Sequence, residues 1–342
     1  MRSYAKDKRL MLISTGGTIA CVPTEQGLAP GLSAKEMLKT INADLSEIDC
    51  IDLFSMDSSN IQPEEWQIIA NEILKCINSN SYAGIVVTHG TDTMAYTASM
   101  LSFLLRCTNI PIVLTGAQLP IINEDSDGRV NLRDSIIAAK ALTPGVYICF
   151  GSDVILGCRA VKTRTVSYNA FESINYPKIA EIKHGEIEYI SEYSINSKGE
   201  ISALSAINPN VALIKLIPGL SADFIKGVLS ANIEGIVVEG FGLGGVHNIR
   251  RDHNEALEYL MKNGVCVVLT SQCLYETSAL DVYAVSRRLL NAGAISAHDM
   301  TTEAAVTKLM WALGAAEGLQ KYDKIKRVEE IFASNYCGEI TL

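Results

Sequence analysis

The sequence predicts an α/β protein with two domains, each built on an open parallel sheet, with the larger domain at the N-terminus. Its 342 residues are enough for about two domains. Short apolar runs alternate with segments of helical period, a pattern typical of parallel strands joined by helices. The apolar runs show no polar alternation, as expected where both faces of a sheet are covered.

In the N-terminal domain, predicted as residues 1–191, strands and helices follow one another in turn. The first predicted helix has Ser33 at its start and Glu36 three residues later, a capping-box pattern. The second begins with Pro63, a residue favoured in the first helical turn. The predicted strands are 10–14, 51–55, 84–88, 112–115 and 146–150, and the predicted helices are 33–41, 63–77, 92–106 and 129–141.

Residues 192–210 are polar and rich in turn formers, and we interpret them as a linker. The alternation then resumes in a smaller C-terminal α/β domain, predicted as residues 211–342. Its predicted strands are 211–217, 235–239 and 265–270, and its predicted helices are 221–229, 254–262, 301–313 and 322–332.

Composition and charge exclude several classes of protein. With 38 acidic against 29 basic residues the formal net charge is −9, which disfavours a nucleic-acid partner. The apolar runs are shorter than the roughly 20 residues that cross a membrane. Residues 10–13, which follow the basic N-terminal residues, are shorter than the apolar core of a secretory signal, roughly 7–15 residues. We therefore expect no membrane partner and a cytoplasmic location.

The nine cysteines are scattered, and no C-x-x-C pair occurs. Several lie inside apolar strand patterns, as Cys149 and Cys266 do. Buried free thiols are the interpretation we favour, and no metal site is expected because structural zinc ligands come in close pairs.

Four loops follow predicted strands and carry polar side chains. They contain residues 14–20 (STGGTIA), 57–59 (DSS), 88–94 (THGTDTM) and 115–118 (TGAQ). Each alone is readily explained as a turn or a helix cap. Because the carboxyl ends of parallel strands form one sheet edge, we expect the four loops to surround one crevice.

Several reactions can be excluded for such a crevice, because the sequence lacks the motifs that they require. It has no P-loop, no G-x-S-x-G elbow and no H-E-x-x-H motif. For His89, the histidine in the crevice, we expect a local structural role. Threonines remain, and a threonine acts as a nucleophile when a base lies within reach. A desolvated lysine can be that base, but from the residues alone Lys162 is expected on the surface.

One competing motif lies in the second domain. Residues 240–245 (GFGLGG) fit the G-x-G-x-x-G pattern of dinucleotide sites and follow a predicted strand. No acidic residue ends the next predicted strand, as that fingerprint requires. We therefore expect a glycine-rich turn near an interface.

Residues 15–20 (TGGTIA) and 89–94 (HGTDTM) resemble the two threonine signatures of the bacterial-type L-asparaginases. Residues 299–309 (DMTTEAAVTKL) resemble a C-terminal stretch of the same family, and the similarity extends over essentially the whole chain. The second loop, residues 56–59 (MDSS), and the lack of a signal sequence resemble the cytosolic type I branch. Leu28 stands where many members have a tyrosine.

The resemblance implies a role for each matching residue. Thr18 matches the primary nucleophile and Thr91 the second catalytic threonine, with Asp92 and Lys162 completing a Thr–Lys–Asp relay. Thr91 and Asp92 also match substrate-binding residues of the family, as do three further positions. Asp57 and Ser58 match residues that hold the substrate's α-carboxylate, Asp92 faces its α-ammonium group, and the backbone carbonyl of Ala117 receives its side-chain amide.

The implied reaction is hydrolysis of L-asparagine to L-aspartate and ammonia through a threonine acyl-enzyme. The resemblance implies no cofactor, a small-molecule substrate, and a homodimer or homotetramer. Preference between asparagine and glutamine depends on one methylene and is left open by the sequence.

Two alternatives remain at this point. The amidase subunit of the archaeal tRNA-dependent amidotransferase shares these motifs but carries an extra N-terminal domain, for which the early position of Thr15 is expected to leave no room. The other alternative is a non-catalytic nucleotide-binding or regulatory module at residues 240–245. It would leave Thr18, Thr91, Asp92 and Lys162 without a common functional role.

Overall fold

The computed structural model describes residues 8–25, 27–193, 206–280, 282 and 284–341. It divides into two compact units, one up to residue 204 and one from residue 205. This division falls within the predicted linker, of which residues 194–205 lie outside the described residues. Within the described part of the chain, no helix is both long and apolar enough to span a bilayer.

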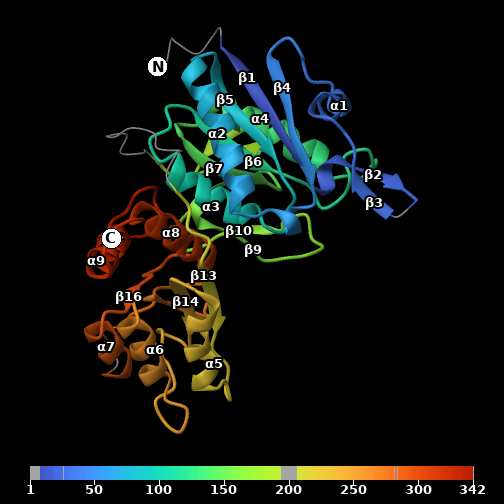
Figure 1. Cartoon of the computed structure of the whole chain (residues 1–342). Coiled ribbons are helices and arrows are strands. Elements are labelled where there is room, and N and C mark those ends of the chain that lie inside the picture. The colour runs from blue at the N-terminus through green and yellow to red at the C-terminus, as the bar shows by residue number, and fades with distance from the viewer. Residues whose placement is uncertain (1–7, 26, 194–205, 281, 283, 342) are drawn as a thin grey trace. The chain divides into compact units, whose positions relative to one another are not determined.

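The first unit is built on an eight-stranded sheet (Figure 1). Its strands lie in the order β12, β11, β8, β7, β6, β5, β1, β4. The five strands from β7 to β4 are parallel, and they confirm the five strands predicted in this domain. They are β1 (Arg9–Gly16), β4 (Ile48–Met56), β5 (Tyr82–Thr88), β6 (Pro111–Thr115) and β7 (Gly145–Phe150).

The other end of this mostly parallel sheet is antiparallel, a feature that the sequence did not predict. β8 (Asp153–Leu156), β11 (Ala180–Lys183) and β12 (Glu186–Tyr189) each run opposite to their neighbours. His184 and Gly185 both have positive φ, the geometry of a two-residue hairpin turn. β12 is the edge strand, and β11 lies between it and β8. Both strands are short and charged: Lys183 of β11 pairs with Glu188 of β12 and with Glu181 of its own strand, so apolar periodicity did not reveal them.

Four helices pack on this sheet: α1 (Ala34–Thr40), α2 (Pro63–Ser79), α3 (Met94–Leu104) and α4 (Gly128–Ala141). The predicted capping box is present, since Ser33 accepts from the Glu36 N–H and Glu36 accepts from the Ser33 N–H. In Figure 1, α2 and α3 lie in front of the sheet and α4 behind it. α3 begins at Met94, two residues later than predicted, so Thr91 and Asp92 belong to the loop before it.

Short elements that the sequence did not predict surround the sheet edge. A turn, η1 (Thr18–Ala20), leads into the hairpin of β2 (Cys21–Thr24) and β3 (Gly27–Pro30), which presents an exposed Leu28. η2 (Ser58–Asn60) follows β4, and η3 (Gly157–Arg159) leads into β9 (Ala160–Lys162), which pairs with β10 (Phe171–Ser173).

The second unit has a parallel sheet in the order β13 (Val211–Lys215), β14 (Gly235–Gly240), β15 (Cys266–Ser271), β16 (Ile295–Ser296). On one face, Ile236 and Val238 join the apolar core with residues of α5 (Ala222–Lys226) and α6 (His253–Lys262). Gly235 lies against α8 (Thr302–Ala315), where a Cβ would be 2.8 Å from a methyl group of Leu309. The remaining elements are η4 (Gly227–Ala231), α7 (Ala284–Asn291) and α9 (Lys321–Phe332).

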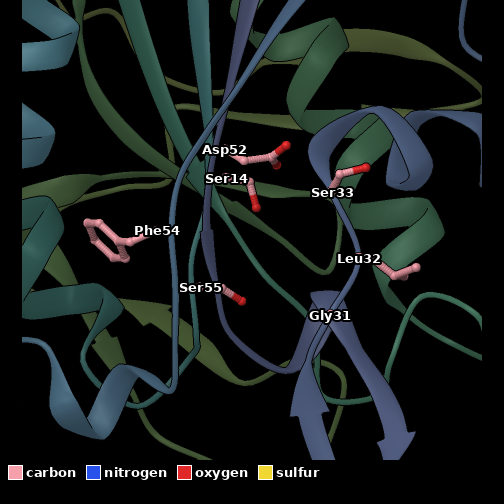
Figure 2. Close-up of a pocket in the computed structure, with 7 residues that line it drawn as sticks. All are labelled: Ser14, Gly31, Leu32, Ser33, Asp52, Phe54 and Ser55. Carbon is pink, nitrogen blue, oxygen red and sulfur yellow. The ribbon is translucent and has the colours of Figure 1, made fainter.

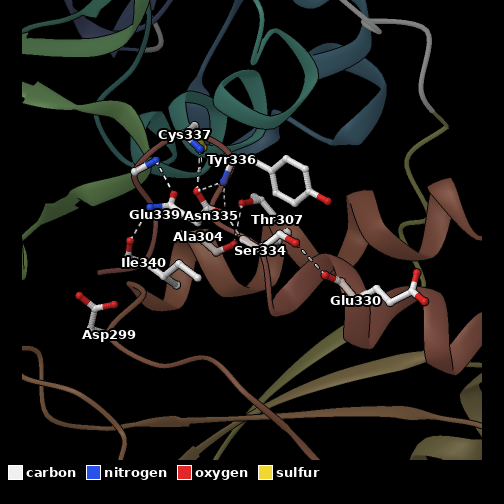
Figure 3. Close-up of polar contacts among 12 residues, drawn as sticks. Asp299, Ala304, Thr307, Glu330, Ser334, Asn335, Tyr336, Cys337, Glu339 and Ile340 are labelled. Carbon is white, nitrogen blue, oxygen red and sulfur yellow. Dashed lines mark hydrogen bonds and ion pairs between the residues drawn. The ribbon is translucent and has the colours of Figure 1, made fainter. Parts of the chain in front are cut away.

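A buried ion pair anchors the C-terminal segment of this unit to α8. Lys308 Nζ lies 2.7 Å from Glu339 Oε1, and both side chains are fully buried. Glu339 also accepts from the backbone N–H groups of Tyr336 and Cys337 (Figure 3). Burial acts to raise the pKa of Glu339, but the charge and hydrogen bond of Lys308, together with the Cys337 N–H, hold it below its usual value.

All nine cysteines are free, as predicted. Six are buried, and burial raises the pKa of the Cys76 thiol to about 11 and that of Cys266 to about 12. The exposed one is Cys273.

Candidate active site

The four predicted loops meet at one edge of the first unit's sheet, with their backbones in close contact. A Cβ on Gly17 would lie 2.3 Å from the Gly90 nitrogen, and one on Gly90 would lie 2.5 Å from Ser58 Oγ. A Cβ on Gly116 would lie 2.4 Å from the carbonyl oxygen of His89. Any larger residue at these positions would push the loops apart, so the glycines allow the crevice to assemble.

Thr18 begins the turn that follows β1. The turn is fixed on both sides, because the Gly17 N–H donates to Met56 O at 2.9 Å and the Ile121 N–H donates to Ile19 O at 3.1 Å. Gly17 has a φ of 77°, a left-handed conformation that favours glycine. Among the described residues, the half-buried Thr18 hydroxyl has no hydrogen-bond partner, which leaves its oxygen available to a substrate.

Lys162 connects Thr91 and Asp92. Its Nζ donates to Thr91 Oγ1 at 2.8 Å and to Asp92 Oδ1 at 2.6 Å. The Lys162 side chain is only 15% exposed, whereas that of Asp92 is 64% exposed. The expectation from residues alone that Lys162 lies on the surface was therefore wrong, because the β9–β10 pair carries it to the third loop.

Asp57 and Ser58 belong to the second loop. Asp57 accepts hydrogen bonds from the Ser59 hydroxyl at 2.6 Å and the Ser59 N–H at 2.8 Å. These bonds hold the pKa of the Asp57 carboxyl below its usual value, so the group is an anion at neutral pH. Ser58 is buried, and its carbonyl accepts from the Thr93 hydroxyl at 2.7 Å. The second and third loops are thereby joined.

The fourth loop contains the buried Ala117 and the half-buried Gln118. The Gln118 amide connects two segments, because its oxygen accepts from the Thr91 hydroxyl at 3.5 Å and its nitrogen donates to Ser167 O at 3.2 Å. The backbone of this loop is bound by Asp127 and Asn131 of the segment that begins α4. Sequence reasoning missed both, although an acid and an amide four residues apart at a helix start were a usable signal.

His89 has the predicted structural role. Its Nδ1–H donates to Gly90 O at 2.7 Å, and its Nε2 accepts from the Thr97 hydroxyl at 2.9 Å. The Thr97 hydroxyl in turn accepts from the indole N–H of Trp66 at 2.9 Å. Complete burial lowers the pKa of His89 to about 4, so the ring is neutral and fixes the carbonyl of Gly90.

This burial predicts a pH dependence of stability. The pKa of His89 is lower in the folded than in the unfolded chain, so below about pH 6.5 the unfolded state binds more protons. Lowering the pH from about 7.5 to about 5 should therefore cost about 2 kcal/mol at this residue. In urea unfolding, His89→Gln should lose about that much less stability over the same range than the wild type. Equal losses in the two proteins would contradict the assignment.

A cavity of about 310 Å³ lies elsewhere in the first unit (Figure 2). It is lined by Ser14, Gly31, Leu32, Ser33, Asp52, Phe54 and Ser55. Its carboxylate, Asp52, accepts from the Ala34 N–H at 2.7 Å at the start of α1. None of the predicted site residues lines this cavity.

Residues 240–245 of the second unit form a tight turn closed by a bridge between Phe241 and Gly245. A Cβ on Gly240 would lie 2.8 Å from the Gly244 carbonyl carbon, so the glycines are needed for the turn itself. α6 begins only at His253, whereas a dinucleotide site requires a helix directly after the glycines. The geometry supports the interpretation as a turn.

Comparison with known proteins shows which family the chain resembles. Residues 9–194 match the family model "Asparaginase, N-terminal", and residues 210–328 match the "Glutaminase/Asparaginase C-terminal domain". The chain is 41% identical to an L-asparaginase of Thermococcus kodakarensis, over 97% of this chain and 99% of that protein. It is 38% identical to a glutamyl-tRNA(Gln) amidotransferase subunit of Pyrococcus abyssi, over 96% of this chain and 76% of that one.

Solved structures agree. The thermostable L-asparaginase from Thermococcus kodakarensis has a TM-score of 0.90 at 40% identity, covering 98% of this chain and 99% of that one. L-asparaginase I from Vibrio cholerae has a TM-score of 0.81 at 29% identity, covering 98% and 100%. The fold and the loop site thus define a two-unit α/β protein of the amidohydrolase type. The chain belongs to the asparaginase family, and the resemblance to its type I branch is confirmed.

Proposed function

We propose that the protein hydrolyses L-asparagine to L-aspartate and ammonia, with Thr18 as the nucleophile. The observation that supports this most is the pair of hydrogen bonds from Lys162 to Thr91 and Asp92, beside the turn that presents Thr18. Thr91 has a hydroxyl bound to a lysine, and its loop contacts the turn of Thr18, whose hydroxyl has no partner in the part of the chain that the structure describes. This arrangement is suited to acyl transfer.

Charge decides how an amino-acid substrate would bind. The resemblance implies that Asp57, like Ser58, holds the substrate's α-carboxylate, but an Asp57 carboxylate would repel that group. We therefore propose that Asp57 joins Asp92 at the α-ammonium group. The α-carboxylate would then bind to the Ser58 hydroxyl and to backbone N–H groups of the same loops. The side-chain amide would reach between Thr18 and the carbonyl of Ala117, which is an acceptor for its NH₂ group.

The reaction proceeds in two halves. Thr18 Oγ1 attacks the amide carbon, and its proton passes through the Thr91 hydroxyl and Lys162 to the amide nitrogen. The C–N bond breaks and ammonia leaves, while the aspartyl group remains as an ester on Thr18. Water then attacks the ester and releases aspartate. Backbone N–H groups of these loops would stabilise the oxyanion, at about 3 kcal/mol per donor.

A second function is favoured by one observation, the 38% identity to an amidotransferase subunit. Such a subunit would use the same chemistry to release ammonia for a partner protein. The chain is 41% identical to the T. kodakarensis L-asparaginase, slightly more than to this subunit, so we keep asparagine hydrolysis as the first proposal. We further propose a cytoplasmic homodimer or homotetramer that needs no cofactor.

The test is release of ammonia by the purified protein, with L-asparagine and L-glutamine assayed side by side. We expect ammonia and aspartate in equal amounts from asparagine without any added protein. Ammonia from glutamine alone, or only after a tRNA-binding partner is added, would favour the amidotransferase function instead.

A further inference from the structure

The backbone of the fourth loop is held by a buried carboxylate outside the catalytic relay. Asp127, which precedes α4, is 7% exposed. It accepts from the Gln118 N–H with both oxygens, at 3.0 and 2.9 Å, and from the Leu119 N–H at 3.1 Å. Its Oδ2 also accepts from the side-chain amide of Asn131 at 3.2 Å.

The contact of Asp127 with the Gln118 N–H also fixes the orientation of the Ala117 carbonyl. The Gln118 N–H and the Ala117 C=O belong to one planar trans peptide, so they point in opposite directions. Fixing the N–H on Asp127 therefore fixes the direction of the Ala117 carbonyl. A negatively charged acceptor on the N–H also polarises the peptide and strengthens its oxygen as an acceptor.

Asn131 holds the peptide on the other side. Its Nδ2 donates to Gly116 O at 2.9 Å, and its Oδ1 accepts from the Gly151 N–H at 3.0 Å. The side chain is fully buried. The Ala117 unit is thus anchored at the Gly116 carbonyl and at the Gln118 N–H, which leaves it no freedom to rotate.

We propose that Asp127 is a positioning residue for substrate specificity: by holding the Gln118 N–H it aims the Ala117 carbonyl at the substrate's side-chain NH₂ and so favours amides over esters. This inference rests on the proposed function. An ester of the same acid has no N–H to donate, so its turnover does not depend on the direction of this carbonyl.

Asp127→Asn tests the proposal without changing size. An amide has a single acceptor oxygen, so its NH₂ group must face either the Gln118 N–H or the Asn131 amide donor, and the turn reorients. For L-asparagine we expect kcat/KM to fall roughly 10- to 100-fold. For L-aspartate β-methyl ester the same variant should stay within about threefold of the wild type.

Asp134→Asn is the matched control. Asp134, within α4, is likewise a buried acid. Among the described residues its carboxylate accepts from the Ser152 hydroxyl and from no group of the fourth loop. We expect its amide-to-ester ratio to equal that of the wild type. Equal losses on amide and ester in Asp127→Asn, or no loss on the amide, would overturn the specificity role.

Hydrogen exchange separates this proposal from the proposed function, since it needs no turnover. The Gln118 amide proton should exchange at least about tenfold faster in Asp127→Asn than in the wild type. In Asp134→Asn its exchange rate should equal that of the wild type. An unchanged Gln118 rate in Asp127→Asn would overturn the positioning even if the enzyme is active. Inactivity of the wild type on both substrates, with the faster exchange present, would instead contradict the proposed function.

Discussion

Replacing Lys162 with methionine is expected to lower kcat for asparagine by roughly 10³-fold. Methionine fills similar space but cannot accept or donate a proton, so the Thr91 hydroxyl loses its partner at 2.8 Å. Asp92 loses the cation at 2.6 Å at the same time. The measurement is steady-state ammonia release, with circular dichroism and thermal unfolding to establish that the variant remains folded.

Lys178→Met is the matched control for this substitution. Lys178 lies in the same unit and also pairs with carboxylates, Asp153 at 2.8 Å and Glu181 at 3.2 Å. Among the described residues its ammonium group pairs with these two carboxylates and with no residue of the threonine loops, so its loss should leave kcat within about twofold of the wild type. Normal turnover in Lys162→Met, or an equal fall in both variants, would remove Lys162 from the chemistry.

The second large effect is on stability. Glu339→Gln should lower the free energy of unfolding by about 3–5 kcal/mol, because it leaves the ammonium group of Lys308 buried without a counter-charge. The other contacts of Lys308 Nζ are the Ser334 carbonyl at 2.7 Å and the rings of Phe332 and Tyr336, about 5.4 and 5.5 Å away. A carbonyl and two aromatic rings do not supply the negative charge that the Glu339 carboxylate provides to Lys308. Urea unfolding followed by tryptophan fluorescence measures the loss, since Trp311 contacts Tyr336.

Glu330→Gln is the control for Glu339→Gln. Glu330 pairs with Arg327 at 3.4 Å, with both side chains about half exposed. An exposed pair of this kind contributes about 0–1 kcal/mol. If the free energy of unfolding fell by the same small amount in both variants, the buried pair would not be what holds residues 334–341 against α8.

Local signals in the sequence predicted much of the fold. The helix starts at Ser33 and Pro63 and the five parallel strands of the first unit depend on neighbouring residues, so pattern and capping rules were sufficient. The antiparallel end of the sheet was missed because β11 and β12 are only four residues long and carry several charged residues, so they show no clear apolar pattern.

The site was predicted in part. The chemistry of loops after parallel strands predicted that Thr18, Ser58, Thr91 and Ala117 would share one edge. The burial of Lys162 was not predictable from its neighbours, because it depends on the β9–β10 pair and on contacts some 70 residues away. For Asp127, the spacing to Asn131 at the start of α4 was a usable signal, but the backbone N–H groups that it binds were not predictable, because no side-chain motif reveals them.

In the proposed mechanism Thr18 forms the covalent bond to the substrate. The most direct measurement is ammonia release from L-asparagine by Thr18→Ala, compared with the wild type and with a folded-state check by thermal unfolding. We expect release to fall to the assay blank in a protein that unfolds at the wild-type temperature. Substantial release from folded Thr18→Ala would contradict it and leave Thr91 as the nucleophile to consider.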